Sequence, residues 1–294
     1  EVRKVGDDFK SMDEKEARDN GLLIDIDKEI DDAFVERTKT VSIRRDLLKN
    51  EGKNVKVVYT PLHGTGAMLV ERVLGELGVE CLTVPEQREP DGDFPTVEYP
   101  NPEEASALKL ALDLGKEEEA DIVIGTDPDA DRIGIAVPVR GELKLITGNQ
   151  LGALLADYIF SSLKELGTLP EKPAFIKTIV TSELQRYIVE HYGVECYDTL
   201  TGFKHIAALI RSFDEQKDGP EFVFGGEESY GYMVGHEVRD KDSIASTLMC
   251  VEMALYLRSQ GKTVIDRLNE LYYEFGYFVE IQVSKYFKGS EGQK

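Results

Sequence analysis

The stretch GTDPDADRIG at residues 125–134 places three aspartates at alternate positions, Asp127, Asp129 and Asp131, directly before Arg132. Carboxylates that converge on one point repel one another unless a hard cation lies between them, and oxygen-only ligands favour Mg²⁺ over zinc. An EF-hand loop is excluded, because its sixth and twelfth positions require Gly and Glu, and here they are Arg132 and Pro138. We therefore predict a Mg²⁺ site, with Arg132 as a catalytic counter-charge for a phosphate group. The alternative is a solvated acidic turn.

A second group of polar residues follows in GGEESYG at residues 225–231. Glu227 and Ser229 combine a carboxylate and a hydroxyl, which suit directed hydrogen bonds to neighbouring sugar hydroxyls. Downstream, His236, Arg239 and Lys241 add positive charge. A long irregular run inside a compact unit is usually functional, so we predict that residues 225–242 bind substrate.

Two shorter loops carry weaker signals. In TLTGFKH, Thr201 and Gly202 precede a predicted helix with Lys204 in its first turn, where a cation opposes the helix dipole and an anionic ligand would relieve it. The alternative there is a structural N-cap. In HGTG at residues 63–66, backbone N–H groups could face an anion and His63 could line the same site. This loop lacks the third glycine of a dinucleotide fingerprint, and a tight strand-to-helix turn explains it equally well.

Strands and helices alternate along the chain and place all four loops after strands. This pattern predicts an α/β fold of two consecutive three-layer α/β/α domains with mixed, mostly parallel sheets. Ligands of such sheets gather at the carboxyl ends of the strands, where these loops lie. The expected strands are 55–60, 79–84, 121–126, 134–139, 143–146, 174–180, 194–199 and 221–225. The expected helices are 29–50, 67–78, 103–119, 149–167, 182–193, 202–213 and 242–260.

Domain boundaries follow from the restart of this pattern near residue 147. We predict a charged N-terminal segment at 1–45, a domain with the metal loop at 46–147, a domain with the sugar loop at 148–275, and the start of a linker at 276–294. The length of 294 residues agrees with two domains of ordinary size.

Composition narrows the possible partners. The chain has 35 basic and 56 acidic residues, a net charge of −21, so binding to a nucleic-acid backbone is not expected. No apolar run of membrane-spanning length is present. The three cysteines are far apart and form no metal or redox pair, which favours a reducing compartment such as the cytoplasm.

The motifs GTDPDADRIGIAV, TLTGFKHI and GGEESYGYMVGHEVRDKD, in this order and spacing, resemble the metal loop, the domain-three hinge loop and the sugar-binding loop of the α-D-phosphohexomutases, the phosphoglucomutase/phosphomannomutase family. The resemblance covers nearly the whole chain as the middle two of the family's four domains. YTPLHGTG and RDKD are most similar to the branch of phosphoglucomutases and phosphopentomutases. No segment resembles the TASHNP phosphoserine loop of domain I or the RPSGTEP phosphate loop of domain IV.

The resemblance implies an intramolecular phosphotransferase, an isomerase that interconverts hexose 1-phosphate and hexose 6-phosphate through a bisphosphorylated sugar and a phosphoserine. It implies Mg²⁺ on Asp127, Asp129 and Asp131, and sugar hydroxyls on Glu227 and Ser229. Because the phosphoserine loop is not in this sequence, we expect a fragment that lacks domains I and IV and is inactive alone. The alternatives are a phosphopentomutase of the same family, a non-catalytic Mg²⁺ and sugar-phosphate module, and a haloacid-dehalogenase-type phosphatase. The last would use Asp127 as its nucleophile, but Asp131 stands where that family has Thr or Val.

Overall fold

The computed structural model describes residues 11–236 and 238–281. The described residues divide into two compact units, and the division falls between Arg37 and Thr38 in the sequence. The first unit contains helix α2 (Glu14–Asp19), capped by the Asp13 side chain, and most of helix α3 (Asp27–Lys39). The predicted 1–45 segment and 276–294 linker lie partly outside the described residues.

The helix predicted over residues 29–50 is wrong, because the chain breaks it into α3 and α4 (Arg45–Glu51). Between the two helices, the Ile43 amide donates to the Glu252 carboxylate at 3.0 Å, and the Ser42 hydroxyl bonds to the same carboxylate. A distant side chain therefore satisfies backbone and hydroxyl groups that a continuous helix would have satisfied locally.

The first sheet has the strand order β2-β1-β3-β4-β5. Strands β1 (Val57–Thr60), β2 (Cys81–Thr83) and β3 (Ile122–Thr126) pair in parallel, whereas β4 (Ile133–Val139) and β5 (Glu142–Ile146) form the predicted antiparallel hairpin. Every residue of β1 and β3 is buried, as expected of strands covered on both faces. Helices α5 (Ala67–Glu76) and α7 (Lys109–Glu117) contact this sheet, and a short helix, α6 (Pro85–Arg88), interrupts the Pro-rich loop.

The helix predicted over residues 103–119 is also wrong at its start, because α7 begins only at Lys109. The preceding residues form successive turns instead. Asn101 starts them: its side chain accepts from the Glu103 amide at 3.0 Å and its carbonyl accepts from the Glu104 amide at 3.0 Å. An Asx turn of this kind competes with helix formation.

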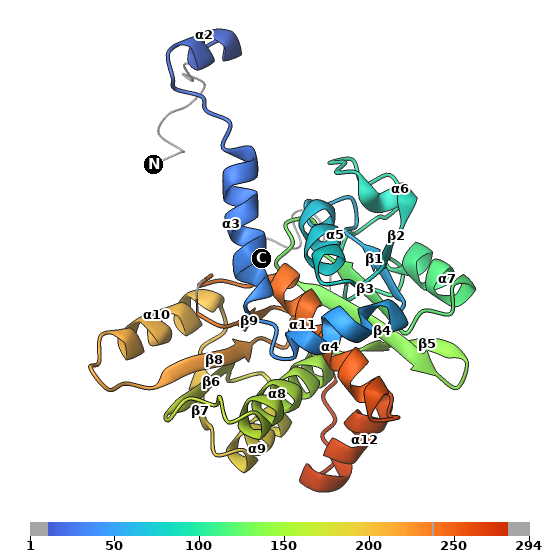
Figure 1. Cartoon of the computed structure of the whole chain (residues 1–294), viewed down its shortest axis with the longest axis vertical. Coiled ribbons are helices and arrows are strands. Elements are labelled where there is room, and N and C mark those ends of the chain that lie inside the picture. Colours follow the sequence, from blue (N-terminus) through green and yellow to red (C-terminus); the bar gives the residue numbers. More distant parts are fainter. Residues whose placement is uncertain (1–10, 237, 282–294) are drawn as a thin grey trace, which may run out of the picture. The chain divides into compact units, whose positions relative to one another are not determined.

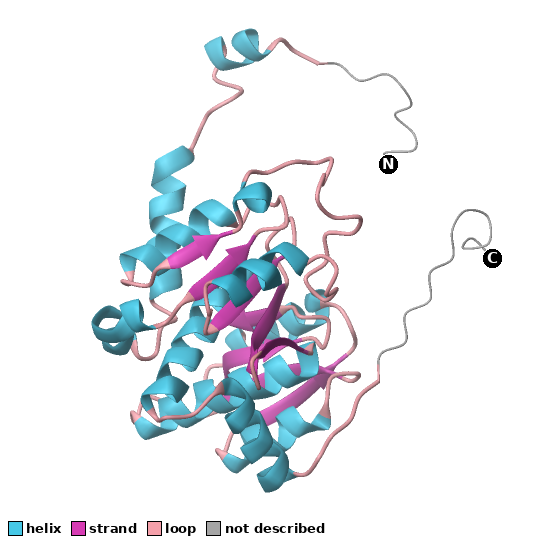
Figure 2. Cartoon of the chain, turned by 90° about the vertical axis from the view of Figure 1, so that its right-hand side faces the viewer, coloured by secondary structure: helices cyan, strands magenta, loops and turns pink. Residues whose placement is uncertain are grey.

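The second sheet has the order β7-β6-β8-β9, and Figure 2 shows strands enclosed by helices. Strands β6 (Pro173–Thr178), β7 (Glu195–Thr199) and β8 (Glu221–Gly226) are parallel, and β9 (Tyr232–Val234) is antiparallel to β8. The helices here are α8 (Gly148–Glu165), α9 (Glu183–His191), α10 (Phe203–Asp214) and α12 (Val264–Phe275). The mixed sheets confirm the predicted fold class, although β9 and α12 were not predicted.

Helix α11 (Ser243–Ser259) joins the two sheets (Figure 1). It contacts β3, β4 and α5 on one side and α8 and β9 on the other. Its side chains are buried almost all round, as expected of a helix enclosed by protein rather than lying on a surface. The carboxyl edges of both sheets are thereby held in one compact unit.

Candidate functional site

The loop that carries the three aspartates, residues 127–132, follows β3 directly and is called the aspartate loop below. Hydrogen bonds within the loop close it. One oxygen of Asp127 accepts from the backbone amides of Asp131 at 3.0 Å and Arg132 at 2.9 Å. Ala130, which lies between Asp129 and Asp131, adopts a left-handed backbone with φ of 57°. The loop brings ligand oxygens of Asp127, Asp129 and Asp131 within 4.8 Å of one another, the one such acidic group among the described residues. Three carboxylate oxygens at this spacing could hold a metal ion.

Two cations face these carboxylates. The Arg132 Nε lies 2.7 Å from Asp127 Oδ2, and the Lys241 Nζ lies 2.8 Å from Asp131 Oδ2. Burial raises the pKa of Asp127 to about 6, against the hydrogen bonds from Arg132. Burial acts to lower the pKa of Lys241, but the hydrogen bond and charge of Asp131 outweigh it and raise this pKa. Arg132 and Lys241 are therefore charged in the neutral range and offset part of the repulsion within the loop.

The HGTG loop packs against the aspartate loop. The Thr65 amide donates to the Pro128 carbonyl at 2.9 Å, and a Cβ on Gly64 would overlap the Pro128 backbone. His63 is buried, has φ of 61° and bonds through Nε2 to the Thr96 hydroxyl at 2.8 Å. The structure thus places this loop as a support beneath the aspartates, with its histidine directed at Thr96.

The sugar loop, residues 227–231, is also fixed by hydrogen bonds. Glu227, only 7 % exposed, accepts from the Gly202 amide at 2.7 Å, and its own amide donates to the Gly231 carbonyl at 2.9 Å. Ser229 is half-buried and lines a cavity of about 340 Å³. Tyr230, the next residue, has φ of 66°. Backbone conformations of this kind in a bulky residue persist only where the surroundings impose them, and they cluster at functional sites.

The aspartate loop of the first sheet and the sugar loop of the second sheet bond directly to each other. Arg132 pairs with Gly231 in an isolated bridge, and the Ile133 amide donates to the Tyr230 carbonyl at 3.0 Å. The first residue of α11, Ser243, donates from its amide and its hydroxyl to the Ala130 carbonyl, at 3.1 and 2.6 Å. These bonds hold the loop with the carboxylate cluster next to the loop that carries Glu227 and Ser229.

The remaining predicted residues lie in three places. Thr201 and Lys204 are exposed, and Gly202 adopts φ of 115° at the start of α10. Arg239 pairs with Asp214, the last residue of α10, and so points away from the helix start at Phe203. His236 is exposed.

Sequence reasoning missed several side chains at the site. Glu103 lies 3.5 Å from an Arg132 nitrogen and lines the same cavity as Ser229. Asn149, at the start of α8, lines it as well. Glu228 turns away from Glu227 to contact Thr178 and Thr181. No local pattern marks Glu103, Asn149 or Thr178, because only the folded chain brings them close to Glu228, which lies within the predicted 225–242 run.

Comparisons with known proteins agree with this arrangement. Residues 32–141 match the family model for phosphoglucomutase/phosphomannomutase alpha/beta/alpha domain II, and residues 147–275 match domain III. A phosphoglucomutase of Staphylococcus haemolyticus is 38% identical over 82% of this chain and 43% of its own length. One of Staphylococcus epidermidis is 36% identical over 85% of this chain and 46% of its own length. The chain thus spans about half the length of the curated relatives it matches.

Solved structures show the same fold. A phosphoglucomutase/phosphomannomutase family protein from Burkholderia thailandensis aligns with a TM-score of 0.64 and 20% identity, over 82% of this chain and 46% of that one. Parafusin, a phosphoglucomutase from Paramecium, aligns with a TM-score of 0.63 and 20% identity, over 84% and 42%.

Proposed function

Because the chain belongs to the phosphoglucomutase/phosphomannomutase family, we propose that it forms the metal-binding and sugar-binding half of a phosphohexomutase. The observation that carries this proposal is the direct bonding of the aspartate loop to the sugar loop through Arg132, Gly231, Ala130 and Ser243. A hexose 1-phosphate held by Glu227 and Ser229 would present its phosphate beside the carboxylate cluster. Phosphoryl transfer requires the metal ion to lie next to the phosphate of the bound sugar.

The residues fit Mg²⁺, since all three candidate ligands offer carboxylate oxygens. Asp127, Asp129 and Asp131 would hold the ion, which would neutralise charge that develops on the transferred phosphoryl group. Arg132 and Lys241 would add fixed positive charge at the same place. Glu227 would accept hydrogen bonds from sugar hydroxyls, and Ser229 would donate to them or accept from them. Because these hydroxyls look alike in both orientations of the sugar, the sugar could bind either way round.

The phosphatase alternative finds no support in the geometry of Asp127. Its side chain is 1% exposed, one oxygen accepts two backbone amides, and the other bonds to Arg132. These hydrogen bonds hold the carboxylate against the loop and hinder its attack on a phosphorus atom, whereas the oxygen that bonds to Arg132 keeps a second lone pair for a metal ion.

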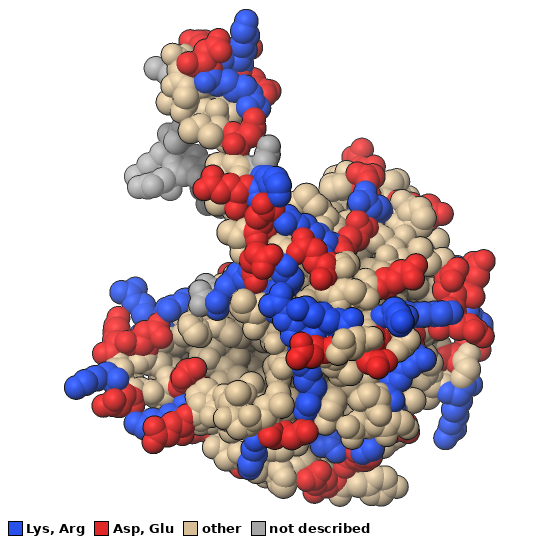
Figure 3. All heavy atoms as spheres, viewed as in Figure 1, with Lys and Arg blue, Asp and Glu red and all other residues tan. Residues whose placement is uncertain are grey.

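Two further features bear on the cellular compartment of the protein and on its binding partners. The three cysteines are free thiols, which supports our proposal of a reducing compartment such as the cytoplasm. Acidic and basic side chains are interspersed over the described residues on the face in Figure 3, so this face is not a continuous basic surface of the kind that binds a nucleic-acid backbone. Within the described part of the chain, no helix is long and apolar enough to cross a membrane.

Titration with Mg²⁺ by calorimetry tests the proposed metal site. We expect weak binding by the wild-type chain, because three protein ligands leave the ion's shell to be completed by other oxygens. Asp129→Asn should weaken it further, and Asp93→Asn, which changes an exposed aspartate outside the candidate ligand group, should not. Unchanged Mg²⁺ affinity in Asp129→Asn would refute the assignment.

A further inference from the structure

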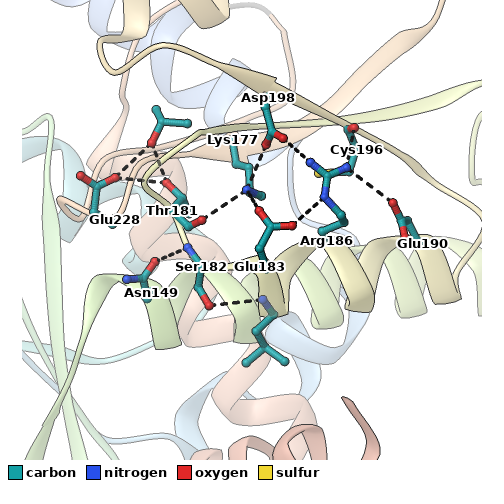
Figure 4. A network of polar contacts seen from close by, with 12 residues as sticks. Asn149, Lys177, Thr181, Ser182, Glu183, Arg186, Glu190, Cys196, Asp198 and Glu228 are labelled. Carbon is teal, nitrogen blue, oxygen red and sulfur yellow. Dashed lines mark hydrogen bonds and ion pairs between the residues drawn. The ribbon is translucent and has the colours of Figure 1, made fainter. Parts of the chain in front are cut away.

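The two adjacent glutamates of the sugar loop point to different supports. Glu227 bonds to the Gly202 amide, in the loop after β7. The Glu228 Oε2 instead lies 3.1 Å from each of the Thr178 and Thr181 hydroxyls, at the end of β6. Figure 4 shows the Glu228 carboxylate directed at Thr181. These hydroxyls are 2.8 Å apart, and both threonines are buried. Glu228 is therefore seated on a pair of hydroxyls that belong to domain III's own framework.

The turn that carries the two threonines is held by a buried lysine (Figure 4). Lys177 is fully buried, and its ammonium contacts Glu183 at 2.6 Å, Asp198 at 2.9 Å and the Thr181 carbonyl at 3.2 Å. A buried ammonium is costly unless all its protons have partners, and here it has three acceptors. Because Asp198 lies in β7, Lys177 links the ends of β6 and β7, and each of these ends supports one glutamate of the sugar loop.

The backbone of Glu228 is fixed from a third direction. A Cβ on Gly148, the first residue of α8, would overlap the Glu228 carbonyl, so only glycine permits this approach. The same end of α8 reaches the threonine turn, because the Asn149 side chain accepts from the Ser182 amide at 2.8 Å. The loop at Glu228 is thus enclosed by β6, α8 and the start of α9.

We propose that Glu228 is a positioning residue, which fixes the sugar loop through Thr178, Thr181 and the Lys177 turn so that Glu227 and Ser229 face the substrate. Glu228 also borders the cavity that Ser229 lines, but its carboxylate is directed at the two threonine hydroxyls, and the proposed role acts through them. The significance of this role rests on the proposed function, but the anchoring can be measured without any ligand.

Hydrogen exchange on the whole chain, followed by NMR, tests the anchoring at two bonded amides, those of Gly202 and Glu227. Glu228→Ala and the double variant Thr178→Val/Thr181→Val should each speed exchange at both amides by about ten- to a hundred-fold, the effect of losing a hydrogen bond to a charged group. Glu228→Gln keeps an oxygen that accepts from the threonines and should stay near wild type. The matched control is Thr247→Val, which removes a buried hydroxyl that has no partner among the described residues.

Exchange at the backbone amide of Val58, in the buried strand β1, reports global unfolding in the same samples. Faster exchange at Gly202 and Glu227, with Val58 unchanged, supports the proposal. Unchanged exchange at the two amides, or equal acceleration at all three, overturns it.

A parallel titration with glucose 1-phosphate separates this proposal from the proposed function. Ser229→Ala should weaken binding and leave exchange unchanged, whereas Glu228→Ala should alter both. If the wild-type chain binds no glucose 1-phosphate, the proposed function is contradicted, and the exchange result still decides the role of Glu228.

Discussion

At the scale of single residues, the site depends on side chains that serve both structure and binding. Glu227 accepts from the Gly202 amide, so its carboxylate holds two loops together before any ligand arrives. Replacing it with alanine would remove both roles at once. A glutamine keeps an oxygen for the Gly202 amide and removes only the charge, which makes it the more informative change.

We expect Glu227→Gln to weaken binding of glucose 1-phosphate by about five- to tenfold, because a hydrogen bond to a charged carboxylate is worth roughly 1 kcal/mol more than one to a neutral amide oxygen. Its free energy of unfolding should stay within about 0.5 kcal/mol of wild type. Ser229→Ala should weaken binding less, since a neutral hydroxyl makes a weaker bond. NMR titration and urea unfolding measure the two quantities. Wild-type affinity together with lowered stability would show that Glu227 is purely structural.

At the scale of elements, glycine contacts decide how closely the loops approach. Gly64→Ala should destabilise the chain by about 1 to 3 kcal/mol, because its Cβ would overlap the backbone of Pro128 and backbone cannot rotate aside. It should also weaken Mg²⁺ binding, since Pro128 lies within the aspartate loop. Thermal unfolding and calorimetry would measure both effects.

The control for this substitution is Gly75→Ala. A Cβ at Gly75 meets nothing within 4 Å, and the residue lies in helix α5, so alanine should stabilise by about 0.5 to 1 kcal/mol. If Gly64→Ala behaved in the same way, the loop after β1 would not support the aspartate loop.

The buried carboxyl of Glu252 ties α11 to the segment before α4 and gives a pH-dependent contribution to stability. Burial raises its pKa above 4.5, against hydrogen bonds from Ser42, Tyr158 and nearby backbone amides. A raised pKa in the folded state means that the folded chain holds the proton more tightly than the unfolded chain. The stabilisation is therefore complete below pH 4.5 and is lost as the pH rises through the raised value.

Urea unfolding from about pH 4 to pH 8 tests this sign. The stability of wild type relative to Glu252→Gln should fall as the pH rises and then level off.

Glu270 provides the opposite case, because its pKa is lowered, chiefly by the hydrogen bond from Lys262. Wild type relative to Glu270→Gln should instead gain stability as the pH rises towards 4.5, by a small amount because this pair is partly exposed. A rising curve for Glu252 would contradict the assignment.

At the scale of the whole molecule, helix α11 and the bonds between the aspartate and sugar loops hold these two loops next to each other. Binding groups alone do not complete a mutase, because the proposed reaction needs a phosphoserine donor and this sequence contains no TASHNP-like segment. We expect the isolated chain to show no measurable mutase turnover, even with glucose 1,6-bisphosphate supplied, since loss of a primary nucleophile costs many orders of magnitude in rate. A coupled assay for glucose 6-phosphate measures this, and turnover by the pure chain would overturn the proposed mechanism.

The sequence by itself determined the fold class, the alternation of strands and helices, and the loops that hold the candidate ligands. These features are local: buried strands such as 122–126 read as apolar runs, and three aspartates at alternate positions need no distant partner to be noticed. The antiparallel hairpin was predictable for the same reason.

Only the tertiary structure decided which side chains face one another. It broke the helix predicted over 29–50 by means of Glu252, more than 200 residues away, and delayed the helix predicted from 103 through the turns at Asn101. It directed Glu228 to Thr178 and Thr181, and Lys241 to Asp131. Such pairings depend on sheet register and helix packing, which sum many weak contacts over the whole chain, so no short stretch of sequence encodes them.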